Sequence, residues 1–299
     1  MRVLAPLLRA TSHTPTVLRV SAAPVAIIPA CTASETWAVA AASGITALSL
    51  QIILTSFFRR SEDIALAKRP AYMAYQLVAF IYMLFATFVG GAIMLDATCW
   101  PINAAAAMLV PRPQIRFLGA VLFGELVLWD VPTCLCVKKL RRADGILHHI
   151  GLAFGPALVA MTCNPTFYYS WFIGLSEASS VPLALNEAFG GAHDMVMEAE
   201  EGSTRLVTLA FFRDIAQIAA AAAFVIVRVL GWSWMCWLLL RDTLAVLPIA
   251  PSAGCGSRIV LKLQLFMASA FYALQLLWFS KLVRFTLDSG LGGSRPDDL

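Results

Sequence analysis

Long runs of apolar residues without a charge decide what this chain can fold into. Three uncharged windows, residues 37–58, 71–95 and 263–280, are long enough to cross the hydrocarbon of a bilayer, which takes about 20 apolar residues. A fourth window, residues 150–176, is interrupted by Asn164-Pro165 and predicts a helix, a turn and a further helix. Because lipid offers no hydrogen bonds to the backbone, each crossing segment must be a helix.

The composition agrees with a membrane protein. Charged residues make up 13% of the chain and hydrophobic residues 60%, and the charged share is about half that of a soluble domain. We therefore predict an all-α, polytopic transmembrane bundle of about seven spans, over residues 36–58, 72–95, 116–137, 147–163, 166–188, 215–240 and 261–285. The apolar run 244–251 is too short to cross, and we expect it to be either a re-entrant segment or a loop.

The chain divides into one membrane domain and two tails. The membrane domain is predicted over residues 35–287, and residues 288–299 form a short C-terminal tail. Residues 1–34 contain Arg2, Arg9 and Arg19, several serines and threonines, and no acidic residue. This composition fits either an organellar transit peptide or a disordered tail, and the sequence leaves both open.

The short basic loops predict the orientation in the membrane. Two loops on the same side carry most of the loop cations, namely Arg59, Arg60, Lys68, Arg69, Lys138, Lys139, Arg141 and Arg142. Since the basic side is cytosolic, we expect a lumenal N-terminus and a cytosolic C-terminus. A net charge of +4 gives no reason to expect a nucleic-acid partner.

The seven cysteines suggest at most limited cross-linking. Four of them, Cys31, Cys99, Cys163 and Cys255, fall on the predicted lumenal side, where one disulfide is a hypothesis. Cys136 follows a span directly before two lysines and is either a palmitoylation position or an ordinary buried cysteine. Cys134 and Cys136 point about 200° apart on a helix and are not expected to form a metal site. We predict no metal and no cofactor.

A few ionisable residues fall within the predicted spans: Glu125, Asp130, His148, His149, Glu177 and Arg228. Because such residues cost about 2.5–3.5 kcal/mol on insertion scales, they usually face protein and serve a function. Glu125 and Asp130 are five residues apart, so an α-helix would place them on different faces. Glu125 is one candidate partner for Arg228 across the bundle.

The paired histidines admit two interpretations. His148 or His149 could act as base or nucleophile in an acyl transfer. Alternatively, the pair caps a helix at the membrane surface and hydrogen-bonds to Asp130 or Glu177. We expect one ring to point into the bundle and the other toward its rim.

The fifth predicted span is rich in small polar residues. Ser176, Ser179 and Ser180 allow close helix approach, and Pro182 kinks the helix. Such a helix is typical either of a lipid-headgroup pocket or of a tightly packed internal helix. Two further motifs are expected to be unremarkable: His193-Asp194 in a solvated loop, and Trp232, Trp234 and Trp237 as interfacial anchors.

The ordered set of polar motifs resembles the TLC-domain family, which includes the ceramide synthases and the TRAM-type translocation proteins. The matching elements cover about residues 36–287: Trp129-Asp130, His148-His149, Glu177-x-Ser-Ser-x-Pro182 with Asn186, Phe224–Arg228, and Leu276–Lys281. The resemblance implies a lipid-related protein whose cavity is lined by Asp130, His148, His149, Glu177, Ser180, Asn186 and Arg228. It also implies an endomembrane location, with the endoplasmic reticulum expected; an organellar membrane is the alternative.

One departure from the ceramide synthases favours the non-synthase branch. The synthase signature has a His-Asp block about thirty residues after the paired histidines, whereas this chain has Glu177 there. We therefore expect a non-enzyme in membrane lipid homeostasis, through lipid binding, sensing or trafficking, with membrane lipids as partners. The alternative is an N-acyltransferase that uses acyl-CoA and a sphingoid base, with His148 and His149 as candidate catalytic residues. A cargo or translocation accessory is a third interpretation.

Overall fold

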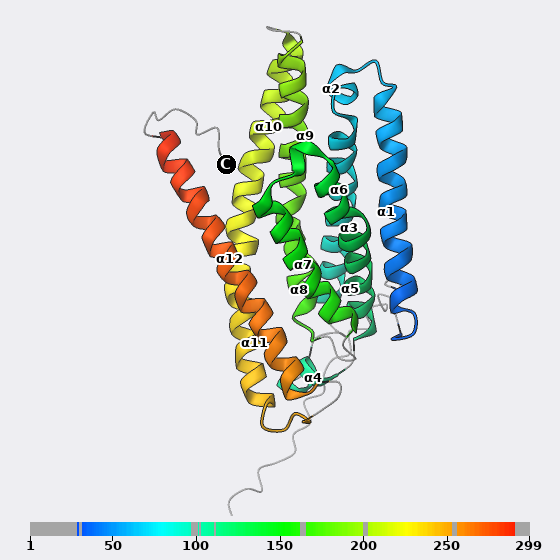
Figure 1. Ribbon diagram of the computed structural model, residues 1–299. Helices are drawn as coiled ribbons and strands as arrows, with labels where there is room; N and C mark the ends of the chain where they lie inside the picture. The colour runs from blue at the N-terminus through cyan, green and yellow to red at the C-terminus, as the bar shows by residue number, and fades with distance from the viewer. Residues whose placement is uncertain are drawn as a thin grey trace, which may run out of the picture.

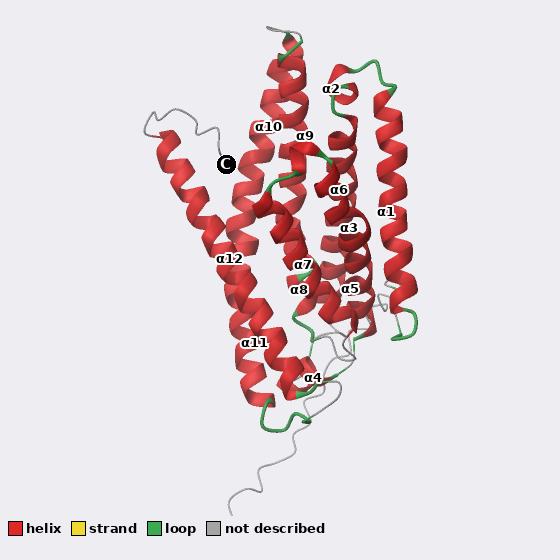
Figure 2. Ribbon diagram, in the orientation of Figure 1, coloured by secondary structure: helices red, strands yellow, loops and turns green. Residues whose placement is uncertain are grey.

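The structure is a computed structural model that describes residues 32–96, 103–110, 112–161, 166–199, 203–252 and 256–290, with residues 29 and 101. Within these ranges every regular element is a helix (Figure 2). The elements are α1 (Thr36–Arg59), α2 (Ile64–Ala67), α3 (Pro70–Leu95), α4 (Ala104–Leu109), α5 (Pro113–Glu125), η1 (Leu126–Asp130), α6 (Val131–Cys136), η2 (Lys138–Leu140), α7 (Ala143–Met161), α8 (Tyr169–Phe172), η3 (Leu175–Ser179), α9 (Ser180–Met197), α10 (Thr204–Ala223), η4 (Phe224–Gly231), α11 (Trp232–Val246) and α12 (Arg258–Gly290). The all-α bundle is confirmed.

The helices pack lengthwise into one bundle (Figure 1). In the part of the chain that the structure describes, five segments are long and apolar enough to cross a membrane: Thr36–Arg59, Pro70–Leu95, Pro113–Cys136, Thr204–Val246 and Arg258–Arg284. A shorter apolar helix, Gly145–Met161, is the main part of α7. The fifth predicted span corresponds to the broken run from α8 through η3 to α9. The number of spans is therefore roughly compatible with the predicted seven.

Two predicted segments differ from their expected form. Residues 166–188 are not one kinked helix: the chain breaks at Gly174, and Pro182 falls in the first turn of α9, where a missing N–H costs nothing. The sixth span extends at both ends into one continuous helical segment of 43 residues, Thr204–Val246. This extension takes residues 205–214 and Leu244 into regular helix, so the short apolar run 244–251 is not a separate re-entrant element.

Close backbone contact holds α1 against α5. The α-carbon of Gly124 lies against Ala40, and a Cβ added there would sit 1.8 Å from the Ala40 carbonyl oxygen. Gly44 on α1 makes the reciprocal approach to the Gly124 carbonyl, at 2.4 Å from its own added Cβ. Since lipid removes the hydrophobic driving force between helices, such close packing of small residues is what stabilises a pair.

Two segments are π-helical, η1 and η4. In a π-helix the hydrogen bonds run from residue i to i+5, so positions five apart lie on the same side. η1 contains Asp130 and η4 contains Arg228, both residues of the predicted site. The wider turns therefore change which way each charged side chain points.

Ion pairs join the elements at the end of the bundle where α1 ends and α10 begins (Figure 1). Lys68 pairs with Glu198 at 2.8 Å, and Lys139 with Asp194 at 3.5 Å. Asp63 caps α2 and pairs with Arg205, whose hydrogen bond lowers the pKa of the Asp63 carboxyl. The two basic loops thus lie at one end, as their predicted common side requires.

Several predictions fall outside the described residues. The four cysteines of the disulfide hypothesis are among them, as are most of the N-terminal tail and residues 291–299. Cys136 is exposed, so palmitoylation stays a prediction.

Candidate functional site

Two adjoining cavities lie inside the bundle. The inner cavity, of about 100 Å³, has mainly apolar walls and includes Glu125, Asp130, His149 and Glu177 in its lining. The outer cavity, of about 760 Å³, is bounded by α7, α9, α10, η4 and α12. Its polar lining consists of His148, His149, Glu177, Ser179, Ser180, Asn186, Asp214, Gln217 and Arg228. His149 and Glu177 line both cavities and mark where they meet.

All seven residues of the predicted cavity line one cavity or the other. The helices bring residues that are far apart in the sequence, from Asp130 to Arg228, to these two adjoining cavities. Asp130 ends η1, His148 and His149 lie in the second turn of α7, Glu177 is on η3, Ser180 and Asn186 are on α9, and Arg228 is on η4. The broken helix matters here, because the 3₁₀ turn η3 presents Glu177 directly to η4.

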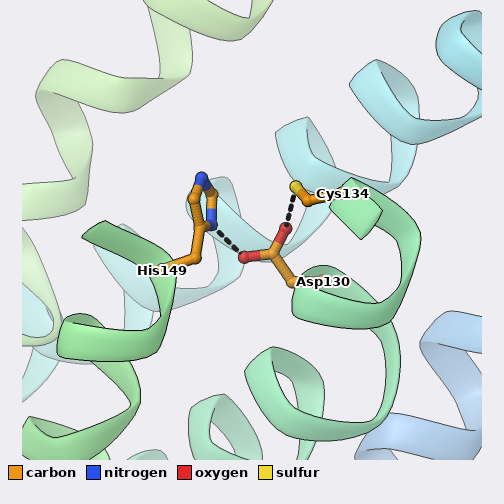
Figure 3. A group of neighbouring side chains, drawn as sticks. All are labelled: Asp130, Cys134 and His149. Carbon is orange, nitrogen blue, oxygen red and sulfur yellow. Dashed lines mark hydrogen bonds and ion pairs between the residues drawn. The ribbon is translucent and has the colours of Figure 1, made fainter. Parts of the chain in front are cut away.

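Asp130 and His149 form a hydrogen bond (Figure 3). A carboxylate only accepts hydrogen bonds, so Nδ1 of His149 donates, and in the neutral ring Nε2 keeps its lone pair. In Figure 3 the Nε2 side of the ring points away from Asp130. Tyr75 donates a second hydrogen bond to Asp130, at 2.8 Å. This arrangement fixes the ring and its tautomer, as the orienting carboxylate of a catalytic histidine does.

Arg228 is buried and pairs with Glu177, not with Glu125. Its Nη2 contacts both Glu177 carboxylate oxygens at 3.0 Å and donates to Ser180 at 2.8 Å, while Nε donates to Ser179 at 2.8 Å. The alternative pairing with Glu125 is therefore wrong. The sequence did not show that η3 would bring Glu177 nearer to Arg228 than α5 brings Glu125.

Glu125 shares the inner cavity with Asp130, contrary to the expectation of separate faces. The π-helical turn between the two residues is the reason, because it brings positions five apart onto one side. Glu125 is 7% exposed and Asp130 3%. Two buried acidic side chains therefore line the same cavity.

Some buried polar atoms at the site have no partner among the described residues. They include Nδ1 of His148 and Oδ1 of Asn186, both on outer-cavity residues. The His148 ring packs edge-on against Trp278, with ring centroids 4.5 Å apart, and against His149 at 5.5 Å. Buried polar groups are nearly always hydrogen-bonded, and these two atoms are exceptions on residues that line the outer cavity.

Two other predictions about local motifs are wrong. α9 continues to Met197, so His193-Asp194 is helical and not in a loop. Trp232 is 3% exposed and packs edge-on against Phe172, so it belongs to the core, whereas Trp234 and Trp237 are exposed and stack on each other as anchors would.

Three contacts around Asp130 were not predicted from the sequence. Tyr75 hydrogen-bonds to it, Cys134 lies 3.7 Å from its carboxylate, and Trp129 stacks on Tyr75 with centroids 5.2 Å apart. The spacing of Asp130 and Cys134, one helical turn, was a signal that they share a face. Nothing in the sequence indicated that Tyr75 of α3 would reach them.

Comparison with known proteins gives one match. A family model described as TLC domain matches residues 34–284. No curated protein and no solved structure matches the chain. The matched range contains every residue of the two cavities.

Proposed function

We propose, given that this chain belongs to the TLC-domain family, that its two-part cavity binds the polar headgroup of a membrane lipid. The protein is an integral membrane protein with a lipid-related function. Lipid binding of this kind would serve lipid homeostasis in an endomembrane such as the endoplasmic reticulum. The expected topology, N-terminus lumenal and C-terminus cytosolic, would open the outer cavity toward the cytosolic half of the bilayer.

One observation carries this proposal: polar and charged groups converge on a cavity with otherwise apolar walls. Arg228 and Glu177 are fixed by mutual contacts, so their geometry exists before a ligand arrives. His148 and Asn186 line the same cavity, and Nδ1 of His148 and Oδ1 of Asn186 have no partner among the described residues. A small number of polar groups held in fixed positions in an otherwise apolar pocket is typical of ligand sites. The apolar walls suit the acyl chain of a lipid.

The test measures the lipid that co-purifies with the protein. Replacement Asn186→Leu removes an acceptor that has no hydrogen-bond partner among the described residues, so no described hydrogen bond to Oδ1 is lost. Bound lipid per chain is counted by mass spectrometry after extraction from lipid nanodiscs. We expect it to fall about five-fold, which is the change in affinity that the loss of one hydrogen bond causes.

A matched pair of leucine variants controls for bulk effects. Leu183→Trp fills the outer cavity, which Leu183 lines, and should displace the lipid. Leu240→Trp adds the same side chain at an exposed position of α11 outside both cavities and should leave the lipid content unchanged. Equal lipid content in wild type, Asn186→Leu and Leu183→Trp would contradict the proposal.

A second candidate function is acyl transfer, favoured by the Asp130–His149 pair. With Nδ1 held by Asp130, Nε2 of His149 is free to take a proton from an amine or to accept an acyl group from acyl-CoA. His148 lacks such an orienting carboxylate among the described residues, so His149 is the better candidate of the two.

Acyl-CoA-dependent N-acylation of a sphingoid base by purified protein tests this candidate. If the wild type turns over, His149→Ala should lower the rate by about 10²–10⁴-fold. His193→Ala, a histidine variant outside both cavities, should keep it. No turnover by the wild type, with lipid still bound, would leave lipid binding as the function.

A further inference from the structure

We infer that Asp130, Cys134 and His149 form a binding site for a zinc ion at the inner cavity. Their side chains come from two separate segments of the chain, η1–α6 and α7. Each offers one donor atom, and the three donors all lie within 4.8 Å of one another. Figure 3 shows the carboxylate between the imidazole and the thiol, with one of its oxygens toward each.

The donor chemistry suits zinc. Imidazole nitrogen, thiolate sulfur and carboxylate oxygen are its usual ligands, at bond lengths of about 2.0–2.3 Å. A tetrahedron with such bonds has donors roughly 3.3–3.8 Å apart. Sγ of Cys134 lies 3.7 Å from Oδ1 of Asp130 and 3.6 Å from the hydroxyl oxygen of Tyr75. These two separations are those of neighbouring donors around one ion, whereas Nδ1 of His149 hydrogen-bonds directly to Asp130 and must move away from the carboxylate to make room for the ion.

The surroundings would hold the ligands in place. Tyr75 hydrogen-bonds to Asp130 and stands next to Cys134, so it is either a fourth donor or an outer partner of the carboxylate. Trp129 stacks on Tyr75 and donates to Gln51. Asp130 and Cys134 are buried, and Glu125, which lines the same cavity as Asp130, adds a further acidic group. A divalent cation would neutralise these acidic groups inside the bilayer, where unpaired charge is costly.

Zinc binding has a defined consequence for protons. Binding releases the Cys134 thiol proton to solvent. At His149 the ion occupies Nδ1, so the single ring proton moves to Nε2 and the ring keeps its proton count. Nε2 then donates and no longer accepts. The zinc-loaded form therefore excludes the acyl transfer that needs a free Nε2 lone pair, whereas lipid binding through Arg228 and Asn186 is compatible with it.

Zinc content of the full-length protein in nanodiscs tests the site. After incubation with Zn²⁺ and removal of loose ions, we expect about one zinc per chain by elemental mass spectrometry. Cys134→Ser should lower this at least about ten-fold, and Asp130→Asn likewise. Cys136→Ser, an exposed cysteine two residues along the same helix, is the matched control and should keep full zinc.

Substitution with Co²⁺ provides a second readout. Thiolate-to-cobalt charge transfer should appear in the wild type and in Cys136→Ser and be lost in Cys134→Ser. No zinc in the wild type, or unchanged zinc in Cys134→Ser, would overturn the inference. Lipid content measured on the same samples separates the two proposals: lipid without zinc overturns only the metal site, and zinc without lipid overturns only lipid binding.

Discussion

Replacing Arg228 with methionine is expected to lower the thermal midpoint of the purified protein by roughly 10 °C. The substitution leaves Glu177 without its ion pair and removes the hydrogen bonds that Ser179 and Ser180 accept. Breaking a buried pair by removal of one partner costs about 3–5 kcal/mol, because the other charge stays uncompensated. Thermal unfolding in a fixed detergent, followed by size exclusion, measures the shift.

A double-mutant cycle separates pairing from packing. Arg228→Met combined with Glu177→Gln removes both charges, so much of the lost stability should return. Lys68→Met is the control: Lys68 and its partner Glu198 are both exposed, so loss of this ion pair should leave the thermal midpoint nearly unchanged. A double variant no more stable than Arg228→Met would show that arginine packing, and not the ion pair, stabilises η4.

The second large effect is expected from Gly124→Ala. The added Cβ would meet the carbonyl oxygen of Ala40 at 1.8 Å, and a backbone atom inside a helix has no freedom to give way. α1 must therefore move off α5, at a cost of at least about 3 kcal/mol. We expect a large loss of folded protein in detergent and a lower thermal midpoint.

Gly151→Ala is the matched control for this change. Gly151 is also a glycine in a helix, but a Cβ there would find its nearest atoms, Cε1 and Cζ of Phe271, at 3.9 Å. The substitution should be neutral or slightly stabilising, since alanine is the better helix former. A Gly124→Ala protein as stable as Gly151→Ala would mean that α1 and α5 are not in direct backbone contact.

The bundle and most of the site residues were predictable from local signals. The length of an apolar run predicts a span because the thickness of the bilayer sets the length that a spanning helix needs. Charged residues are rare within spans, so those present, Asp130, His149, Glu177 and Arg228, are indicated as site residues. The structure then confirms that a histidine of the pair hydrogen-bonds to Asp130.

Side-chain direction was not predictable. Glu125 and Asp130 were expected on different faces because α-helical geometry was assumed between them. A single π-helical turn instead brings them onto one side. Similarly, the partner of Arg228 depends on the break at Gly174, where the added Cβ would lie 2.4 Å from the Ser170 carbonyl oxygen. Both features follow from contacts between distant segments, which no local pattern records. The cluster of Tyr75 with Cys134 has the same origin.

The Glu177–Arg228 pair also constrains how the chain is made. Synthesis proceeds from the N-terminus, so Glu177 emerges first, in a broken segment that is not among the long apolar helices. Its partner follows 51 residues later. Until then the carboxylate has no counter-charge, and the segment gains little by leaving the insertion machinery for lipid. Entry of the fifth and sixth segments is therefore a coupled event, completed when the long helix that contains Arg228 arrives beside them.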